Sequence, residues 1–170
     1  MEIIVSSKQL APIQALEFKP NYVISILDPR DNHPSFSNAQ ILSLDFDDIC
    51  FELKDTAWMY DKVVMPSKEN VRDIYQFSKN NFKEDSRILV HCYAGISRSS
   101  AAAIISLSAH MDWREAVSKI ANLQTMTMLN FYESGTSWFS PNNLMIKYLD
   151  EMLGLNGEME DLVEHTFRQI

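Results

Sequence analysis

The chain has 170 residues, 46% of them hydrophobic, which fits one globular domain over residues 1–170. Its formal charge of −8 argues against a nucleic-acid-binding protein and against docking on an anionic membrane. With two cysteines, no signal-peptide pattern and no apolar run long enough to span a bilayer, we expect no disulfide framework and a cytoplasmic location, where a thiol stays reduced.

Four segments are predicted to be β-strands. The first three are rich in apolar and β-branched residues, and the fourth is a short apolar run of the kind that lies buried inside a parallel sheet. The second ends at Asp28-Pro29, a turn signal, and the polar residues 29–40 that follow predict a loop. The predicted strands are 3–5, at an edge of the sheet, then 21–27, 39–46 and 87–91.

Helical periodicity and capping residues predict six helices. The second begins after Ser67, with Asn70 where a capping-box acid would stand, and Asp112 caps the fourth. The fifth has Pro141 at its first position and stops at Gly154. The predicted helices are a short one capped by Ser6 or Ser7 and ending near Leu16, then 67 to about 80, 97–110, 113 to about 123, 140–153, and one from 157 toward the C-terminus.

The order of these elements predicts an α/β fold. Strands are mixed with helices in the first half and helices alone follow, which favours a small, mostly parallel central sheet flanked by helices, with a helical C-terminal half. The predicted strand 87–91 leads through a short turn directly into the helix 97–110. Because ligands bind at the carboxyl ends of strands in open α/β sheets, this turn is the expected site.

The residues of this turn suit the chemistry of phosphate. Small residues at a helix N-terminus let backbone N–H groups form an anion cradle, and Arg98 adds a planar fork that can hold two phosphate oxygens. Cys92, at the start of the cradle, can attack phosphorus as a thiolate and form a covalent intermediate. Ser99 can hydrogen-bond the sulfur and help it leave. The turn has the sequence His91-Cys92-Tyr93-Ala94-Gly95-Ile96-Ser97-Arg98-Ser99.

This nine-residue segment resembles the signature of the cysteine-based protein tyrosine and dual-specificity phosphatase superfamily. The small bacterial dual-specificity-phosphatase-like group is the most similar, since its loop lies between a Phe-x-Asp-Ile motif and a Pro-Asn-led helix. Those motifs correspond here to Phe46-Asp47-Asp48-Ile49 and Pro141-Asn142. The resemblance implies a phosphatase-like fold and a phosphate-monoester hydrolase that needs no cofactor or metal. Its substrates would be phosphorylated proteins or small phosphomonoesters, bound by the loop residues Tyr93, Ala94, Gly95, Ile96, Ser97 and Arg98.

The resemblance also implies an aspartate after the third strand as general acid. Asp45, Asp47 and Asp48 crowd this position, and the match to Phe-x-Asp-Ile favours Asp48, with Asp47 as the alternative and Asp61 as a third candidate. The spacing from Asp48 to the phosphate loop, residues 92–98, is longer than in compact members of the family. Residues 50–66 are therefore predicted to be an insertion. The alternative is that these acids only occupy the end of a loop.

Other residues near these motifs allow two interpretations each. His91 either steadies the phosphate loop by hydrogen-bonding its carbonyls or is a strand-end histidine with satisfied hydrogen bonds, and no second ligand is spaced to make it a metal site. Cys50 is either a half-buried cysteine or the partner of Cys92 in a regulatory disulfide. The cluster 58–60 either lines a substrate pocket or packs in the core. Asn142 either positions the attacking water or the phosphate loop, or simply begins a helix.

Two other functions fit parts of the pattern. One is a pseudophosphatase that binds phosphorylated partners without turnover, and the other is a rhodanese-like sulfurtransferase, whose loops also cradle anions. The Ser97-Arg98-Ser99 ending favours a phosphatase. Tyr93 and Ile96 are uncharged, whereas enzymes for inositol polyphosphates and phosphoinositides tend to have lysines there. Phosphotyrosine, phosphoserine and small-metabolite phosphates all stay open.

Overall fold

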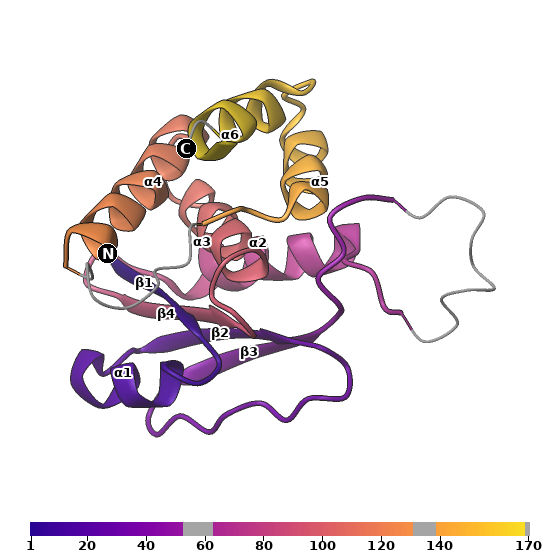
Figure 1. Ribbon diagram of the computed structural model, residues 1–170. Helices are drawn as coiled ribbons and strands as arrows, with labels where there is room; N and C mark the ends of the chain where they lie inside the picture. The colour runs from indigo at the N-terminus through magenta and orange to yellow at the C-terminus, as the bar shows by residue number, and fades with distance from the viewer. Residues whose placement is uncertain (53–62, 131–138, 169–170) are drawn as a thin grey trace.

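The computed structural model describes residues 1–52, 63–130 and 139–168 (Figure 1). Within these ranges, helices alone follow the last strand, as expected of the C-terminal half. No helix in these ranges is long and apolar enough to cross a membrane. The elements are β1 (Glu2–Ser7), α1 (Ala11–Phe18), β2 (Tyr22–Leu27), β3 (Gln40–Asp45), α2 (Lys68–Asn81), β4 (Arg87–Cys92), α3 (Arg98–Ser108), α4 (Trp113–Asn130), α5 (Asn143–Leu153) and α6 (Glu158–Arg168).

The strands form one four-stranded sheet in the order β1-β4-β2-β3. All three pairings of these strands are parallel, which confirms the prediction of a mostly parallel sheet. β4 lies between β1 and β2, with Ile88 paired to Ile3 on one side and to Tyr22 on the other. A central strand covered on both faces needs apolar residues at consecutive positions, which explains the unbroken apolar run in β4.

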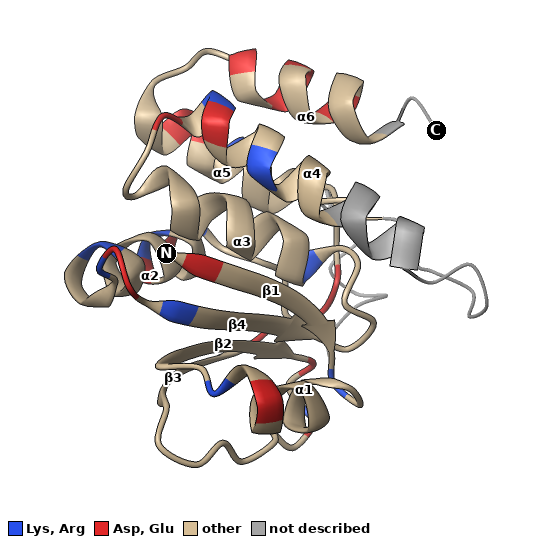
Figure 2. Cartoon of the chain, turned by 90° about the vertical axis from the view of Figure 1, so that its left-hand side faces the viewer, with Lys and Arg blue, Asp and Glu red and all other residues tan. Residues whose placement is uncertain are grey.

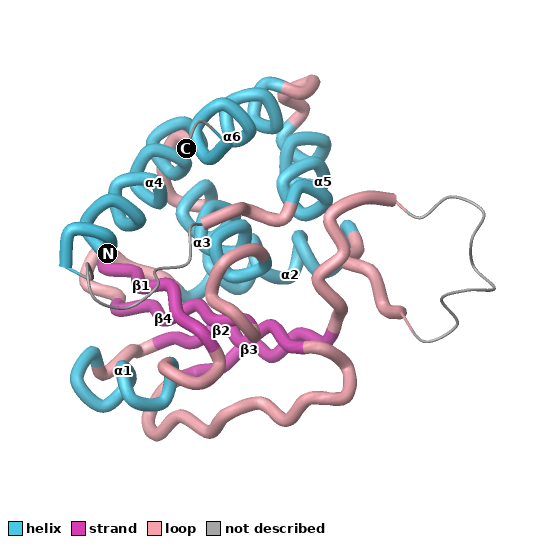
Figure 3. Tube along the Cα trace, in the orientation of Figure 1, coloured by secondary structure: helices cyan, strands magenta, loops and turns pink. Residues whose placement is uncertain are grey.

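Helices cover both faces of the sheet. α1 and the long loop between β2 and β3 lie on one face (Figure 3). There Ala11 and Phe36 pack with Val23 and Leu89. The other helices lie on the opposite face (Figure 2). α3 is the innermost of these, and every one of its residues is buried. Its small residues at positions 101–103 let it pack closely between the sheet and the outer helices.

Several predicted helix boundaries agree with the structure and others are wrong. The capping box of α2 is confirmed: the side chain of Ser67 accepts the N–H of Asn70, and the side chain of Asn70 accepts the N–H of Ser67 at 2.9 Å. Neither Ser6 nor Ser7 caps α1, because both belong to β1 and pair with β4. α4 continues beyond the predicted end near 123.

The predicted start of α5 is also wrong. Pro141 lies before the helix, and the N-cap is Asn142, whose Oδ1 accepts the N–H of Met145 at 3.1 Å. The helix ends, as predicted, at Gly154, which adopts a left-handed conformation with φ of 69°. The predicted cluster 58–60, the candidate acid Asp61 and most of the predicted insertion 50–66 lie outside the described residues.

Candidate active site

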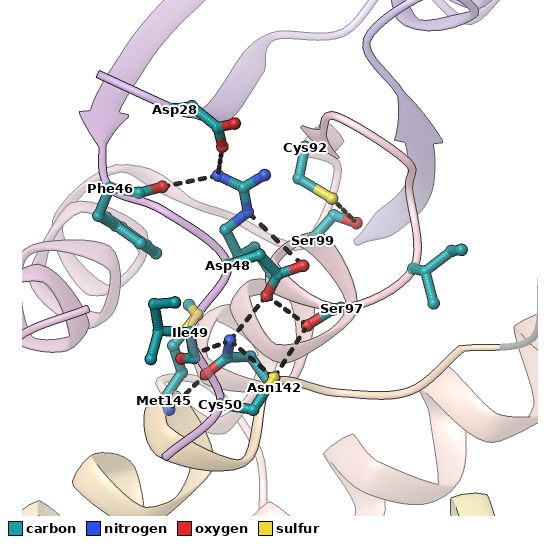
Figure 4. Close-up of polar contacts among 12 residues, drawn as sticks. Asp28, Phe46, Asp48, Ile49, Cys50, Cys92, Ser97, Ser99, Asn142 and Met145 are labelled. Carbon is teal, nitrogen blue, oxygen red and sulfur yellow. Dashed lines mark hydrogen bonds and ion pairs between the residues drawn. The ribbon is translucent and has the colours of Figure 1, made fainter. Parts of the chain in front are cut away.

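The sulfur of Cys92 lies where β4 ends, at the carboxyl edge of the sheet. Its Sγ accepts the N–H of Gly95 at 3.2 Å. It also lies 3.2 Å from Oγ of Ser99 (Figure 4). Residues 93–97 connect Cys92 to the N-terminus of α3, whose helix dipole places partial positive charge beside the loop. The N–H of Gly95, the hydroxyl of Ser99 and the N-terminus of α3 therefore lie around the sulfur.

Gly95 lets this loop pack against the end of β1. Its φ is +78°, and a Cβ built on it would lie 2.7 Å from the backbone carbon of Ser6 and the backbone nitrogen of Ser7. Beyond the strand, the N–H of Lys8 donates to the carbonyl oxygen of Tyr93 at 3.1 Å. The shape of the loop thus depends on the neighbouring strand as well as on its own residues, and only glycine fits at position 95.

Arg98, the first residue of α3, is 2% exposed and held by residues that follow two other strands. Its Nη1 donates to Oδ1 of Asp28 at 2.7 Å and to the carbonyl oxygen of Phe46 at 2.6 Å. Its Nε is buried, lies 3.9 Å from Oδ2 of Asp48, and makes no hydrogen bond with any described residue. One end of the fork is anchored by hydrogen bonds, while the Nε edge makes only the ion pair with Asp48 among the described residues.

Asp28 is a residue of the site that the sequence reasoning missed. Locally it is a strand-end aspartate before a proline, which signals only a turn. Its role depends on β2 lying next to β4, because this pairing brings the carboxyl ends of the two strands, and so Asp28 and Arg98, together. A sequence that predicts strands but not their order carries no signal for this contact.

The two candidate acids after β3 have different surroundings. Oδ1 of Asp48 accepts hydrogen bonds from Oγ of Ser97 at 2.7 Å and from Nδ2 of Asn142 at 2.8 Å. Asp47 is bound instead to Val64, whose N–H donates to Oδ2 of Asp47 at 2.8 Å and whose carbonyl oxygen accepts the N–H of Asp47 at 2.7 Å. The structure therefore brings Asp48 to the phosphate loop, while Asp47 joins the two ends of the predicted insertion.

His91 does not make the hydrogen bonds expected of it. It is fully buried against the ring of Phe36, and neither ring nitrogen has a hydrogen-bond partner among the described residues. Burial lowers the pKa of His91 to about 4; the backbone of Cys92 opposes this in part, and His33 and Lys8 add to it. His91 is thus a buried histidine with a lowered pKa and the backbone of Cys92 as a polar neighbour, and its role in steadying the loop stays a prediction.

The remaining predicted site residues are partly exposed. Tyr93 and Ala94 are exposed and border a cavity of about 760 Å³, a volume within the range of small-molecule sites. Ile96 and Ser97 are half-buried, and their carbonyl oxygens accept N–H groups of Ser140 and Asn142 at 3.2 Å. The other residues bordering the cavity come from the end of β1 and from the loops after β1 and β2: Ser7, Lys8, Gln9, Asp31, Asn32 and Pro34.

Cys50 is more exposed than the packing interpretation expects, while its regulatory disulfide with Cys92 on oxidation stays a prediction. It is exposed rather than half-buried, and neither Cys50 nor Cys92 is in a disulfide. Its Sγ lies 3.5 Å from Nδ2 of Asn142 and 3.9 Å from Oγ of Ser97, at the side of the phosphate loop. Among the residues that the structure describes, no group of three or more His, Cys, Asp or Glu side chains could hold a metal ion.

Comparison with known proteins gives matches of structure only. No protein-family model and no curated protein matches the sequence. Human DUSP28 has a TM-score of 0.62 at 14% identity, over 91% of this chain and 94% of that chain. A human tyrosine phosphatase-like serine/threonine/tyrosine-interacting protein has a TM-score of 0.60 at 18% identity, over 91% and 92%. DUSP15 has a TM-score of 0.54 at 17% identity, over 99% and 92%.

These matches show that the chain has the fold of the dual-specificity phosphatases. They confirm, at the level of the fold, the resemblance to the cysteine-based protein tyrosine phosphatase superfamily and the expected α/β phosphatase-like architecture. At such identities the likeness concerns the fold, so activity must be argued from the side chains of the site.

Proposed function

We propose that this chain is a phosphate-monoester hydrolase of the protein tyrosine or dual-specificity phosphatase type, with Cys92 as nucleophile. The observation that carries the proposal is the environment of Sγ, which has the N–H of Gly95 and the hydroxyl of Ser99 each at 3.2 Å. Buried Arg98 supports the same conclusion, because its Nε makes no hydrogen bond with a described residue and that edge can bind two phosphoryl oxygens. A cysteine that served only packing would need none of these groups.

In the first step the Cys92 thiolate attacks phosphorus in line. The S–P bond forms as the bond from phosphorus to the leaving oxygen breaks, and Asp48 donates a proton to that oxygen. The loop amides and Arg98 stabilise the charge on the three phosphoryl oxygens. Oδ1 of Asp48 already accepts two hydrogen bonds, so we assign the transferred proton to Oδ2.

In the second step water attacks the phosphocysteine. Asp48, now ionised, takes a proton from the water, the P–S bond breaks and inorganic phosphate is released. The sulfur leaves as a thiolate, and the hydroxyl of Ser99 stabilises it by donating a hydrogen bond. Because the thiol must stay reduced between turnovers, we expect the protein to act in a reducing compartment such as the cytoplasm.

The test is hydrolysis of an aryl phosphate by the full chain without added metal. We expect turnover that vanadate inhibits, that Cys92→Ser abolishes and that Cys50→Ser retains. The Cys50 variant is the matched control, since it makes the same change in the exposed cysteine. Activity that survived Cys92→Ser would overturn the proposal. A panel of phosphotyrosine, phosphoserine and small-metabolite esters, scored by kcat/KM, would then identify the substrate class.

A phospho-binding module without turnover is the second candidate. It is favoured by the partners of Asp48, because a carboxylate that serves only to fix Ser97 and Asn142 would make the same two contacts on Oδ1. Tight binding of a phosphate analogue by a wild-type chain that hydrolyses no ester would support it. The sulfurtransferase alternative is not proposed, because the matching structures reported above are phosphatases and phosphatase-like proteins.

A further inference from the structure

Asn142 is a fully buried side chain that contacts two parts of the site in addition to its own helix. Its backbone N–H donates to the carbonyl oxygen of Ser97 at 3.2 Å. Its Nδ2 donates to Oδ1 of Asp48 at 2.8 Å and to the carbonyl oxygen of Ile49 at 3.1 Å. Its Oδ1 accepts the N–H of Met145 at 3.1 Å. One residue thus joins the phosphate loop, the segment with the candidate acid and α5 (Figure 4).

Helix capping accounts for only part of this arrangement. A cap requires an acceptor, and Oδ1 of Asn142 supplies it to Met145. Serine, threonine or aspartate would cap equally well, and none of them has an amide group. The NH₂ of asparagine is needed for the two bonds to Asp48 and Ile49. The choice of asparagine is therefore explained by the acid segment and not by the helix.

The two donors on Asp48 fix one oxygen and leave the other available. Ser97 and Asn142 both donate to Oδ1, while Oδ2 faces Nε of Arg98 at 3.9 Å. The carboxyl group is partly exposed and belongs to a segment that continues into the predicted insertion, so without these bonds it would sample several rotamers. The bonds hold Oδ2 on the side of the arginine whose free edge is assigned to the phosphoryl group.

We infer that Asn142 is a positioning residue, which holds Asp48 in the orientation from which Oδ2 protonates the leaving group. The inference rests on the proposed phosphatase function. It adds that the orientation of the acid comes from the residue before α5, a segment distant in sequence from both Asp48 and Cys92. Asn142 itself touches neither the sulfur nor the expected position of the phosphoryl group.

The inference predicts an effect that depends on the leaving group. Phenol is a poor leaving group that needs a proton, whereas 2,4-dinitrophenol departs as an anion without one. General acid catalysis contributes about 10²- to 10⁴-fold where the proton is needed. A change that only misplaces the acid should therefore slow hydrolysis of phenyl phosphate and spare 2,4-dinitrophenyl phosphate.

The test variant is Asn142→Ser, which keeps a capping oxygen and removes the amide donor. We expect kcat for phenyl phosphate to fall about 10-fold or more, which is part of the rate enhancement that a general acid supplies. The kcat for 2,4-dinitrophenyl phosphate should change less than about 2-fold. Ser97→Ala, which removes the other donor to Oδ1, should shift the two substrates in the same unequal way. Asn122→Ser, the same change at an exposed position of α4, should leave both rates unchanged.

Equal losses on both substrates, or no loss on either, would overturn the inference. If Asn142→Ser fails to fold, Asn142→Asp decides the question, since it keeps the size and the capping oxygen and turns a carboxylate toward Asp48. It must then lose phenyl phosphate hydrolysis selectively. If the wild type is active and Asp48→Asn hydrolyses phenyl phosphate as fast as the wild type does, the role of Asp48 as the acid is refuted. The role of Cys92 as nucleophile would still stand. A wild type inactive on both esters would refute the proposed function itself.

Discussion

Replacing His91 by leucine should make the fold less sensitive to mild acid. His91 is fully buried, and neither ring nitrogen has a hydrogen-bond partner among the described residues. Its burial holds the pKa near 4 in the folded chain, against an ordinary value of 6.5. Below pH 6.5 the unfolded chain therefore takes up a proton that the folded chain refuses, so stability falls as the pH drops from 6.5 toward 4.

The size of this effect follows from the two pKa values. Each pKa unit corresponds to 1.36 kcal/mol, so the full loss below pH 4 is about 3 kcal/mol, and about 2 kcal/mol of it is present at pH 5. Leucine has a similar volume and no polar atoms. Since an unsatisfied buried polar group costs about 1–3 kcal/mol, His91→Leu should be at least as stable as the wild type near neutral pH.

Urea unfolding followed by the fluorescence of buried Trp113 measures both quantities. We expect the wild type to lose about 2 kcal/mol more than His91→Leu between about pH 7.5 and about pH 5. Parallel losses in wild type and His91→Leu would show that His91 is protonated in the folded chain and would refute the reasoning.

Three further substitutions test the phosphate loop. Asp28→Asn removes the charge from the 2.7 Å contact with Arg98. Because a charge-assisted hydrogen bond contributes about 1.5–3 kcal/mol, we expect kcat/KM to fall about 10- to 100-fold. A kcat/KM within about twofold of wild type would contradict this. Gly95→Ala places a Cβ 2.7 Å from the β1 backbone, so both the melting temperature and turnover should fall, and unchanged thermal melting would refute it. Ser99→Ala removes the 3.2 Å contact with Cys92, which is assigned to the second step. Steady-state turnover should therefore fall about 10-fold, while the burst of phenol released in the first step persists. Loss of the burst would place Ser99 in the first step.

The phosphate half of the site could be predicted from the sequence because it is local. Cys92, Gly95 and Arg98 lie within one turn between a buried strand and a helix, and their chemistry follows from that turn. The contacts of Asp28 and Asn142 could not be predicted, since they depend on the strand order and on the position of α5. Long-range pairing of this kind leaves no periodic signal in the sequence.

The errors in helix boundaries have the same physical origin. Ser6 and Ser7 have the composition of a cap, but pairing with β4 includes them in β1. Pro141 is well suited to a first helical turn, yet the backbone of Asn142 is bound to Ser97, so α5 begins one residue after that contact. In both places tertiary hydrogen bonds overrode a local preference.

The central position of β4 links thiol chemistry to the folding of the whole chain. β4 pairs with β1, from the N-terminus, and with β2, and residues beyond both strands shape the phosphate loop or anchor Arg98. Such non-local pairings form slowly and together, because loop closure must precede the contacts that reward it. We therefore expect the loop around Cys92 to reach its final shape only once the sheet has assembled. During refolding, we expect the reactivity of Cys92 to recover together with the completion of the sheet.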